Sequence, residues 1–500
     1  MDTAPLLLAL DQGTTSTRAM LFSAEGAVEF EARRPLSATY PQPGWVSQDP
    51  TEIIETVLAT GREAVAWADR AGRRIAGVGI TNQRETAVLW ERESGRPVAP
   101  AIVWQSRQSA PQVEQLAAAG HASRIQHVTG LVPDASFSAT KLMWLFDHDS
   151  TLRSRAENGD LCFGTVDSWM CWHLLEGRHV TDRTNASHTM LMDLATGNWS
   201  SEMLAVCDIS AAVLPEILDT WGPIGEVPAS VLGVAMPLGG IIGDQQSALF
   251  GQACLLPGQA KNTYGTGAFL LLNTGGSIPR SAHGMLATVA LSHAGTTSYA
   301  SEGAVLVTGS AVQWLRDGLG VIRQAEDVEP LAASVPDSGG VVFVPALTGL
   351  GGPYWDPGAR GTMLGLTRGT TTAHIARATL EGLAYQTRDV IDAMEKDTGI
   401  RLTELRVDGG ATRNDLLMQI QADVLGVPVV RPRNTETTAW GAAALAGLTA
   451  GVIASPDRLA AEWQEERRFN PNLGSDLAEH GYQRWQRAVE RAGGWAVEGD

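Results

Sequence analysis

The chain has 500 residues, of which 44% are hydrophobic and 18% charged, and its net charge is −18 at pH 7. This length exceeds what one hydrophobic core supports, so we expect at least two globular domains, and the composition excludes a disordered protein. The negative charge is spread along the chain without a block of like charges, which disfavours a nucleic-acid-binding surface.

Cysteine usage and hydropathy indicate the cellular compartment. The four cysteines are scattered and form no Cys-x-x-Cys pair, which fits reduced thiols better than a disulfide framework. No segment has the roughly 18 apolar residues that a membrane-spanning helix needs, and none has the pattern of a secretory signal peptide. The most apolar segment, 440–454, is rich in Gly and Ala and predicts a helix that packs closely on a neighbour. We therefore expect a cytoplasmic protein that does not span a membrane.

The first strong pattern is an apolar run, residues 6–10, that ends in Asp11 and is followed by Gly13 and several hydroxyl side chains. It predicts a strand, a tight turn and a second strand, and Gly13 lets other groups approach the turn. Turn amides and hydroxyl groups form a donor-rich concavity that suits phosphate oxygens, and Asp11 at its mouth can hold a hydrated Mg²⁺. An ordinary hairpin with a polar turn explains this stretch equally well when it is considered alone. The side chains that would contact phosphate are Thr14, Thr15, Ser16 and, through a charge-assisted bond, Arg18.

A buried strand over 75–80 ends in a polar segment, and polar groups at strand ends are where α/β proteins build ligand sites. In that segment, Arg84 and Glu85 pair a donor with an acceptor and together can bind vicinal hydroxyl groups. Trp104, after a further apolar segment, offers a flat wall for the carbon face of such a ligand. Taken singly, a surface ion pair and a core tryptophan are the simpler explanations of these residues.

A short apolar strand over 239–243 ends in Asp244 and two amides, after which a helix begins. A carboxylate at such a junction can accept a proton from an incoming hydroxyl group and can orient that group. An aspartate that only caps the helix is the alternative, and it would be a complete explanation of Asp244 alone.

A turn followed by an apolar strand recurs in the second half of the chain, where Gly265-Thr266-Gly267 echoes Gly13-Thr14-Thr15. We interpret this as a weak internal repeat, so that the protein would consist of two related halves with one phosphate loop each. Two such loops that face one another across a cleft would grip a polyphosphate from both sides.

Helical periodicity and end signals predict the remaining helices. They cover 50–66 after the capping Asp49, most of 138–175 with its tryptophans in the core, a stretch that opens at Gly309, 372–397 closed by Gly399, a stretch that contains Leu417 and ends at Gly426, and a charged, solvated cover from 470 on. Before the helix that contains Leu417, the turn Gly409-Gly410 would let a ring or a phosphate lie against the backbone, and Asn414 could donate a hydrogen bond to such a ligand or accept one from it. Neither common nucleotide-binding glycine motif and no clustered Cys/His metal pattern occurs, so an ATP site would have to use the paired turns.

Together these stretches resemble the FGGY carbohydrate kinase family. The resemblance runs in order along essentially the whole chain, over Leu10–Arg18, Gly79–Thr86, Ala101–Gln105, Gly164–Asp167, Thr181–Asn185, Gly243–Phe250, Lys261–Gly267, Trp355–Gly361 and Val407–Gly410. It implies an α/β fold of two actin-like, ribonuclease-H-type domains with an interdomain cleft. The domains would be 1–251, which binds a polyol, and 252–500, which binds the nucleotide.

The resemblance also implies an activity and the residues that carry it. The γ-phosphoryl group of ATP would pass to a polyol hydroxyl, with glycerol as the expected substrate, sn-glycerol 3-phosphate as the product and Asp244 as the general base. The implied substrate-binding residues are Arg84, Glu85, Trp104, Ser136, Asp244, Gln245 and Phe269. The implied nucleotide-binding residues are Thr14, Thr15, Ser16, Arg18, Thr266, Gly309, Gln313, Gly410 and Asn414. Mg²⁺ would be handled by Asp11 and Asp244, and a homodimer or homotetramer is expected.

One position departs from the family. In members that phosphorylate glycerol, a pocket tyrosine precedes the Phe-Ser of a Phe-Ser-x-Thr-Lys run, whereas Ser136 precedes that run here. The smaller side chain leaves space, so a longer polyol such as erythritol, threitol or xylitol is the alternative substrate. Because apolar walls discriminate only about 10- to 200-fold per methylene, the change can also simply relax specificity. A non-catalytic, actin-like ATP-binding scaffold is a remote alternative, which the presence of Arg84, Glu85 and Asp244 together disfavours.

Overall fold

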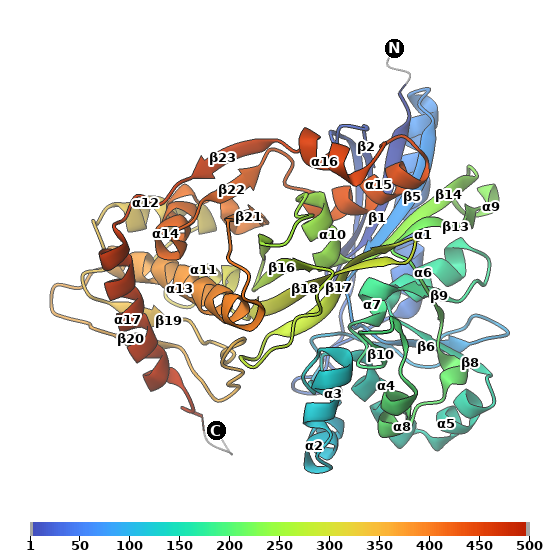
Figure 1. Ribbon diagram of the computed structural model, residues 1–500, viewed down its shortest axis with the longest axis horizontal. Helices are drawn as coiled ribbons and strands as arrows, with labels where there is room; N and C mark the ends of the chain where they lie inside the picture. Colours follow the sequence, from blue (N-terminus) through green and yellow to red (C-terminus); the bar gives the residue numbers. More distant parts are fainter. Residues whose placement is uncertain (1–3, 497–500) are drawn as a thin grey trace.

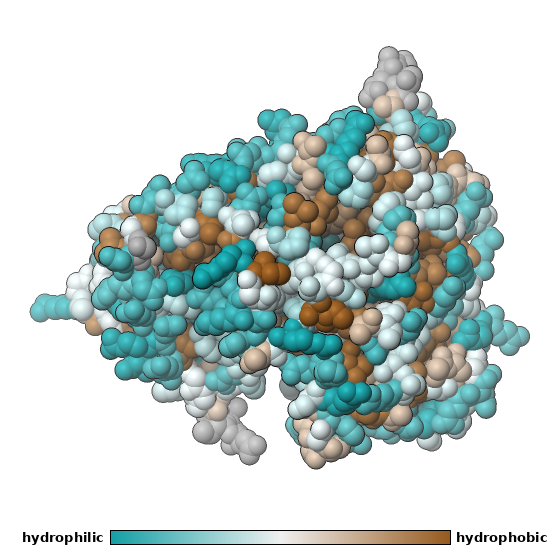
Figure 2. Space-filling model, viewed as in Figure 1, coloured by the Kyte–Doolittle hydropathy of each residue, from teal (hydrophilic) through white to brown (hydrophobic). Residues whose placement is uncertain are grey.

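The computed structural model describes residues 4–496, so residues 1–3 of the first predicted domain and 497–500 of the second lie outside the described part. Two mixed β-sheets in two domains lie side by side, each with helices against it, as the α/β prediction required (Figure 1). On the face drawn in Figure 2, hydrophilic residues cover most of the lobe that carries α17, and the lower margin is hollowed between the two lobes.

The first sheet has six strands in the order β13-β14-β5-β1-β2-β3. β1 pairs antiparallel with β2 and parallel with β5, and β5 pairs parallel with β14. The bounds are β1 Leu6–Gln12, β2 Ser16–Phe22, β3 Val28–Pro35, β5 Ile75–Asn82, β13 Trp221–Val227 and β14 Met236–Gly243.

The second sheet has seven strands in the order β17-β18-β16-β15-β21-β22-β23. β15 pairs antiparallel with β16 and parallel with β21, and β21 pairs parallel with β22. The bounds are β15 Gln259–Tyr264, β16 Ala268–Gly275, β17 Leu286–His293, β18 Thr296–Val305, β21 Glu404–Asp408, β22 Val429–Pro432 and β23 Glu465–Phe469.

Helices and short strands surround these sheets. The helices are α1 Pro50–Arg70, α2 Ala110–Ala118, α3 Ala122–Thr129, α4 Ser138–His148, α5 Ser150–Glu157, α6 Val166–Leu174, α7 Arg183–Ala186, α8 Ser201–Cys207, α9 Ala229–Leu232, α10 Asp244–Gly251, α11 Gly309–Asp317, α12 Val328–Ala333, α13 Thr372–Thr398, α14 Asp415–Leu425, α15 Thr437–Thr449, α16 Pro456–Glu462 and α17 Ser475–Ala492. The short strands are β4 Ser47–Gln48, β6 Val88–Glu91, β7 Ala101–Ile102, β8 Leu161–Gly164, β9 Val180–Asp182, β10 Met192–Asp193, β11 Asn198–Trp199, β12 Glu216–Leu218, β19 Val342–Val344 and β20 Thr362–Leu364. Within residues 4–496, no helix is both long and apolar enough to cross a bilayer.

Helices lie on both faces of β1, which explains why its sequence is an unbroken apolar run instead of an alternating one. Leu6, Leu8 and Leu10 belong to the buried cluster that includes α1, whereas Leu7 and Ala9 belong to the cluster that includes α15. All seven residues of β1 are buried.

The predicted helix ends are confirmed. Asp49 accepts a hydrogen bond from the Thr51 backbone N–H at 2.8 Å and caps α1. Gly399 and Gly426, with φ of +69° and +71°, end α13 and α14 in the left-handed conformation that favours glycine.

One helical prediction is confirmed with an interruption, and one needs correction. The segment 138–175 is mostly helical, as predicted, because it forms α4, α5 and α6. Strand β8 interrupts it between α5 and α6, and the four residues of β8 are all buried and pair antiparallel with β6. The helix near the C-terminus, α17, is more than a solvated cover. It buries Tyr482 and Trp485, and both side chains donate hydrogen bonds of 2.7 Å to the carboxylate of Asp389 in α13.

Helix α15 confirms the close packing predicted for the Gly/Ala-rich segment, and its place in the molecule is notable. It comes from the second half of the chain but packs on the first sheet and on α10. A Cβ atom on Gly79 of β5 would lie 1.9 Å from the Ala442 carbonyl oxygen, and one on Gly441 would lie 2.1 Å from that of Ser247. Because the backbones approach this closely, the core of the first sheet depends on both halves of the chain.

Candidate active site

Three predicted site segments leave the first sheet at the same edge. Strand register aligns Gln12 of β1 with Asn82 of β5 and Asn82 with Gly243 of β14. These three residues are the last of their strands. The residues that follow them, Gly13, Gln83 and Asp244, therefore lie side by side at the carboxyl ends of the strands. The first turn, the Arg84-Glu85 pair and Asp244 are brought together by parallel strand pairing, as α/β ligand sites are.

The predicted loops of the second half converge in the same way. Thr263 of β15 is in register with Asp408 of β21, so the turn after Tyr264 and the Gly409 turn leave the sheet side by side. A Cβ atom on Gly409, whose φ is +89°, would lie 2.3 Å from the Tyr264 carbonyl oxygen. The start of α11 joins them, because the Gly309 N–H donates to the Gly265 carbonyl at 3.1 Å. Thr266, Gly309 and Gly410 thus line one group of backbone turns.

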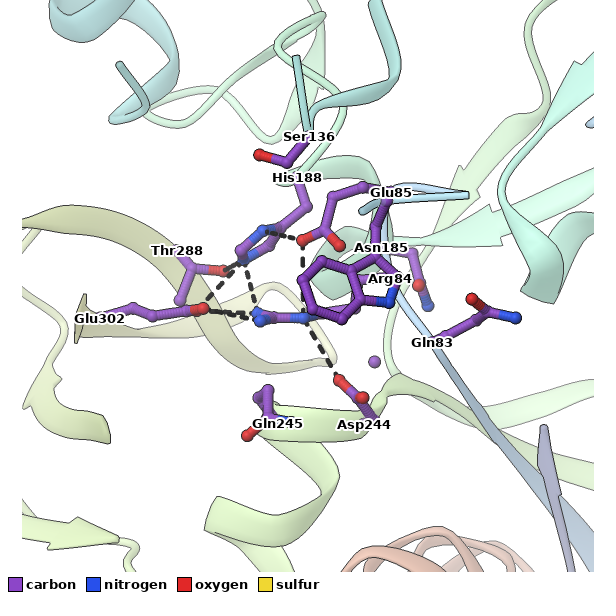
Figure 3. A network of polar contacts seen from close by, with 12 residues as sticks. Gln83, Arg84, Glu85, Ser136, Asn185, His188, Asp244, Gln245, Thr288 and Glu302 are labelled. Atoms are coloured by element: carbon purple, nitrogen blue, oxygen red, sulfur yellow. Dashed lines mark hydrogen bonds and ion pairs between the residues drawn. The ribbon is translucent and has the colours of Figure 1, made fainter. Parts of the chain in front are cut away.

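Arg84 is the centre of a buried network of charged side chains, not part of a surface ion pair (Figure 3). Its Nη1 and Nη2 donate to the two carboxylate oxygens of Glu302 at 2.7 and 2.6 Å. Its Nε lies 3.3 Å from Oδ1 of Asp244 and 3.7 Å from Oε1 of Glu85. The guanidinium of Arg84 therefore connects the two acidic groups expected to face a polyol.

Glu85 is held in an unusual backbone conformation beside His188. Its φ is +62°, a left-handed conformation that costs a residue with a Cβ atom on the order of 1 kcal/mol. Its Oε1 lies 2.8 Å from Nδ1 of His188, and Nε2 of His188 lies 3.3 Å from Oε2 of Glu302. Burial and the Arg84 charge lower the pKa of His188, but the two glutamates outweigh them and raise it. The imidazole thus lies between two carboxylates on opposite sides.

Asp244 does not cap α10: the capping residue is Gly243, and Asp244 is the first residue of the helix. Its side chain is 30% exposed, and its Oδ1 is buried without a hydrogen-bond partner among the described residues. Burial raises the pKa of this carboxyl group to about 6, although the nearby charge of Arg84 opposes the shift. A carboxylate with a raised pKa and an unsatisfied oxygen suits proton acceptance near neutral pH.

Gln245 is oriented by Lys261, a buried lysine of β15. Lys261 Nζ donates to Oε1 of Gln245, to the Thr263 hydroxyl at 3.0 Å and to the Phe269 carbonyl at 3.2 Å. Burial lowers the pKa of Lys261 to about 8. Gln245 of the first sheet's α10 is in this way tied to the hairpin that carries Thr266.

Trp104 links the same two regions and is only partly buried, so it is not a core tryptophan. Its Nε1 donates to the hydroxyl of Thr14 at 2.9 Å, in the first turn. Its ring meets that of Phe269 edge to face, with 6.1 Å between ring centroids. The two aromatic side chains therefore lie where the first turn meets the second half of the chain.

Ser136 lies next to Glu85 (Figure 3). Lys141, which is buried, donates from Nζ to the backbone carbonyls of both residues, at 3.2 Å in the case of Glu85. The Ser136 hydroxyl donates to Oδ1 of Asp134 at 2.7 Å, and that carboxylate accepts from Nη1 of Arg107 at 2.9 Å. The position predicted to carry an aromatic wall in relatives thus carries a polar one here.

The predicted nucleotide-binding residues retain exposure, in contrast to the buried Arg84 and Glu85. The exposed ones are Thr15, Thr266, Gln313 and Gly410, and the partly exposed ones are Thr14, Ser16, Arg18, Gly309 and Asn414. Several of these side chains already have partners: the Thr14 hydroxyl accepts from Trp104, and that of Ser16 accepts from Nε of Arg33 at 3.2 Å. Oδ1 of Asn414 accepts from the Leu417 N–H at 2.8 Å and caps α14, and Arg18 forms ion pairs of 2.5 Å with Asp11 and with Glu436. Exposed turns beside a buried polar cluster are what a large charged ligand and a small polar one would need.

Comparison with known proteins assigns the chain to a family. Residues 6–251 match the N-terminal domain, and residues 260–450 the C-terminal domain, of the FGGY family of carbohydrate kinases. The chain belongs to this FGGY family.

Relatives within the FGGY family cover nearly the whole chain. A glycerol kinase from Aromatoleum aromaticum is 57% identical over 98% of this chain and 99% of that protein. One from Dechloromonas aromatica is 55% identical over 98% of each. Among solved structures, a Plasmodium falciparum glycerol kinase with ADP is 33% identical, with a TM-score of 0.94 over 98% of each chain. A xylulose kinase from Rhodospirillum rubrum is 25% identical, with a TM-score of 0.87 over 97% of this chain and 98% of that one.

Metal binding in this FGGY protein would need help from the nucleotide. Within residues 4–496, no group of three or more His, Cys, Asp or Glu side chains is placed to hold a metal ion. Oδ2 of Asp11 accepts hydrogen bonds from Nε and Nη2 of Arg18, whereas Oδ1 of Asp244 accepts no hydrogen bond from the described residues. Since Mg²⁺ commonly uses one or two carboxylates and completes its shell with water and phosphate oxygens, Asp11 and Asp244 fit this limited role.

Sequence reasoning missed two members of the buried network around Arg84, Glu302 and His188. Neither stands at a strand end, in a glycine turn or at a motif spacing, so no local pattern points to it. The one available signal was the glutamate itself, a charged residue inside β18, where its neighbours Ser301 and Gly303 are also buried. A buried charge requires a partner, and only the fold identifies Arg84 as that partner.

Proposed function

We propose that this FGGY-family protein transfers the γ-phosphoryl group of ATP to glycerol and forms sn-glycerol 3-phosphate. The observation that carries the proposal is the position of Asp244, beside Arg84 and Glu85 and at the sheet edge where the first glycine turn opens. The relatives named glycerol kinase, similar over nearly the full length, support glycerol as the polyol.

The Arg84-Glu85 pair would bind neighbouring hydroxyl groups of the polyol, with Arg84 donating and Glu85 accepting. Trp104 and Phe269 would cover the carbon face, and Gln245 would add an oriented amide. Asp244 would accept the proton of the terminal hydroxyl as its oxygen attacks the γ-phosphorus. A bond forms between that oxygen and phosphorus, the bond between the γ-phosphorus and the bridging oxygen breaks, and ADP leaves with the electron pair. Phosphoryl transfer depends mainly on positioning and electrostatics, which such a site supplies.

The two glycine turns would hold the nucleotide through backbone N–H groups and hydroxyl side chains. Thr14, Thr15, Ser16 and Arg18 would serve from the first half, and Thr266, Gly309, Gln313, Gly410 and Asn414 from the second. Gln313 lies four residues after Gly309, on the same side of α11 and one turn further along. Mg²⁺, held by Asp11 and Asp244 together with phosphate oxygens, would neutralise phosphate charge.

We also propose the division of the chain into a polyol-binding part, 1–251, and a nucleotide-binding part, 252–500. This division is supported by the residues proposed to bind the polyol, most of which lie in the first part: Arg84, Glu85, Trp104, Asp244 and Gln245. Two features do not follow it, because Phe269 of the second part would contact the polyol and the first turn would contact the nucleotide.

A homodimer or homotetramer is the proposed assembly, and sedimentation velocity would measure it.

The experiment that tests the function is a substrate panel. Glycerol, erythritol, threitol and xylitol are each incubated with ATP and Mg²⁺, ADP release is followed, and the product is identified by ³¹P NMR. The highest kcat/KM is expected for glycerol. No transfer to any polyol would overturn the kinase proposal and favour a scaffold that only binds ATP.

Ser136 supports a second candidate, a kinase for a longer polyol. Its hydroxyl is held by Asp134 next to Glu85, so a polar wall borders the pocket where an aromatic side chain would shorten it. A clear preference for erythritol, threitol or xylitol in the panel would select this candidate. In that case Ser136→Tyr should move the preference toward glycerol, whereas an unchanged preference would show that the position does not matter.

A further inference from the structure

Glu302 comes from β18 of the second sheet but reaches into the site built by the first. Its carboxylate accepts from both terminal nitrogens of Arg84, at 2.7 and 2.6 Å. Both side chains are buried, with 5% exposure for Arg84 and 3% for Glu302. A two-point contact between planar groups fixes orientation as well as distance, so Glu302 determines how the guanidinium is turned.

The contacts of the Nη groups leave one edge of Arg84 for a ligand. Nη1 also lies 2.8 Å from Nε2 of His188 and donates to Oε1 of Gln246 at 3.3 Å. The Nε edge is the one that lies between Oε1 of Glu85, at 3.7 Å, and Oδ1 of Asp244, at 3.3 Å. The donor presented to a polyol is therefore selected by the protein groups bound to the opposite edge (Figure 3).

Strand β17, which pairs with β18, supports the second residue of the pair, Glu85, through His188. Thr288 of β17 lies 3.1 Å from Nε2 of His188 through its hydroxyl, and that hydroxyl accepts from Nε2 of Gln246 at 2.9 Å. His188 in turn lies 2.8 Å from Glu85. Strands β17 and β18 thus reach both residues of the Arg84-Glu85 turn, whose strained φ needs such support.

We propose that Glu302 is a positioning residue for polyol binding, which turns the Nε edge of Arg84 toward the substrate. It follows that the polyol site is complete only when the β17–β18 hairpin of the second sheet is docked on the first half. This inference rests on the proposed function, because glycerol is the polyol with which it is tested.

The test is a double-variant cycle of Glu302→Gln, Arg84→Lys and the two combined. Glu302→Gln keeps the length of the side chain and removes one of the two acceptors. We expect the KM for glycerol, and its dissociation constant by calorimetry, to rise about 10- to 100-fold, as small misplacements of binding groups do, while the KM for ATP stays within about 2-fold. Because Glu302 acts through Arg84, the combined variant should bind glycerol no more weakly than Arg84→Lys alone.

Two further variants keep the test decisive. Glu404→Gln is the matched control: Glu404 lies in the same sheet and pairs with Arg406 and Arg468 at 2.9 and 3.1 Å, and its loss should leave the KM for glycerol unchanged. If Glu302→Gln fails to fold, Glu302→Asp, which preserves the buried charge but shortens the reach, should still raise the KM for glycerol selectively.

The outcomes separate this inference from the function on which it rests. A wild-type protein that does not phosphorylate glycerol contradicts the proposed function, whatever the variants do. An active wild type with unchanged glycerol affinity in Glu302→Gln or Glu302→Asp overturns the positioning role. Effects of Arg84→Lys and Glu302→Gln that multiply in the combined variant would overturn it too, because Glu302 would then act independently of Arg84.

Discussion

The two sheets of this protein have the same arrangement around their central strands. In the first sheet, the hairpin β1–β2 is followed on its β1 side by β5 and then β14, which run parallel to β1. In the second sheet, the hairpin β15–β16 is followed on its β15 side by β21 and then β22, which run parallel to β15. A third strand extends each hairpin antiparallel, β3 in the first sheet and β18 in the second. The hairpin turns are Gly13-Thr14-Thr15 and Gly265-Thr266-Gly267, so the predicted repeat has a structural counterpart.

The third strands differ, and this difference separates the roles of the two halves. Most of β3 is exposed at the edge of its sheet, whereas β18 is largely buried and is covered at its edge by β17. Of these two third strands, β18 is therefore the one that brings a charged side chain, Glu302, to the site of the opposite half. The repeated strand arrangement thus gives each half one glycine turn. The burial of the third strand decides which half adds a side chain to the polar site of the other.

Asp244→Asn should produce the largest effect and tests whether the buried site of the first half, and not the exposed turns, carries the chemistry. Removal of a positioned base typically costs about 10²- to 10⁴-fold in rate. We expect kcat for glycerol to fall by that amount while the dissociation constant for ATP without Mg²⁺, measured by calorimetry, changes little. Asp208→Asn is the control, because Asp208 pairs with Arg153 at the surface and its φ of +52° suits asparagine. Normal turnover in Asp244→Asn would refute the general-base assignment.

Gly79→Ala tests the dependence of the first half on α15. The new Cβ atom would lie 1.9 Å from the Ala442 carbonyl oxygen, so β5 and α15 must separate. Overpacking of this kind costs about 1–3 kcal/mol, which should appear as a lower urea midpoint with one cooperative transition. Gly276→Ala, where nothing lies within 4 Å of the added atom, should leave the midpoint unchanged. A stable Gly79→Ala protein would mean that α15 does not constrain the first sheet.

The two turns should respond differently to alanine at their third position. A Cβ atom on Gly267 would lie 2.5 Å from the Val305 carbonyl oxygen at the end of β18, whereas Thr15 is exposed. Gly267→Ala should destabilise the protein by about 1–3 kcal/mol, and Thr15→Ala by no more than about 0.5 kcal/mol. Thermal or urea unfolding measures both. Equal effects would show that the second turn is not restricted by the third strand.

The pH dependence should distinguish the polyol end from the nucleotide end. Burial raises the pKa of Asp244 to about 6, and only the ionised carboxylate accepts a proton. As the pH falls below about 6, kcat/KM for glycerol should therefore drop about tenfold per unit. The hydroxyl, amide and guanidinium groups proposed to hold the nucleotide do not titrate in that range. An acidic limb near the ordinary aspartate pKa of about 4 would contradict the raised value.

Much of the fold was predictable, because its signals are local. Asp49 before a proline starts α1, Gly399 ends α13, and the apolar run before Asp11 forms β1. The interruption at β8 was missed because its four apolar residues also fit a helix, and only pairing with β6 makes them a strand. In the site, strand ends and glycine turns identified Asp244, Arg84 and both turns as candidates.

The sequence by itself determined the strands, the turns that require glycine and the polar residues at the sheet edge, since these follow from backbone preferences within a few residues. Only the tertiary structure decided that α15 packs on the first sheet and contributes to its core. It also decided that Glu302 orients the guanidinium of Arg84, a residue 218 positions earlier in the chain. The physical reason is that a buried charge has no preferred partner in the sequence. Its partner is the opposite charge that the two sheets bring within hydrogen-bond distance at a buried position.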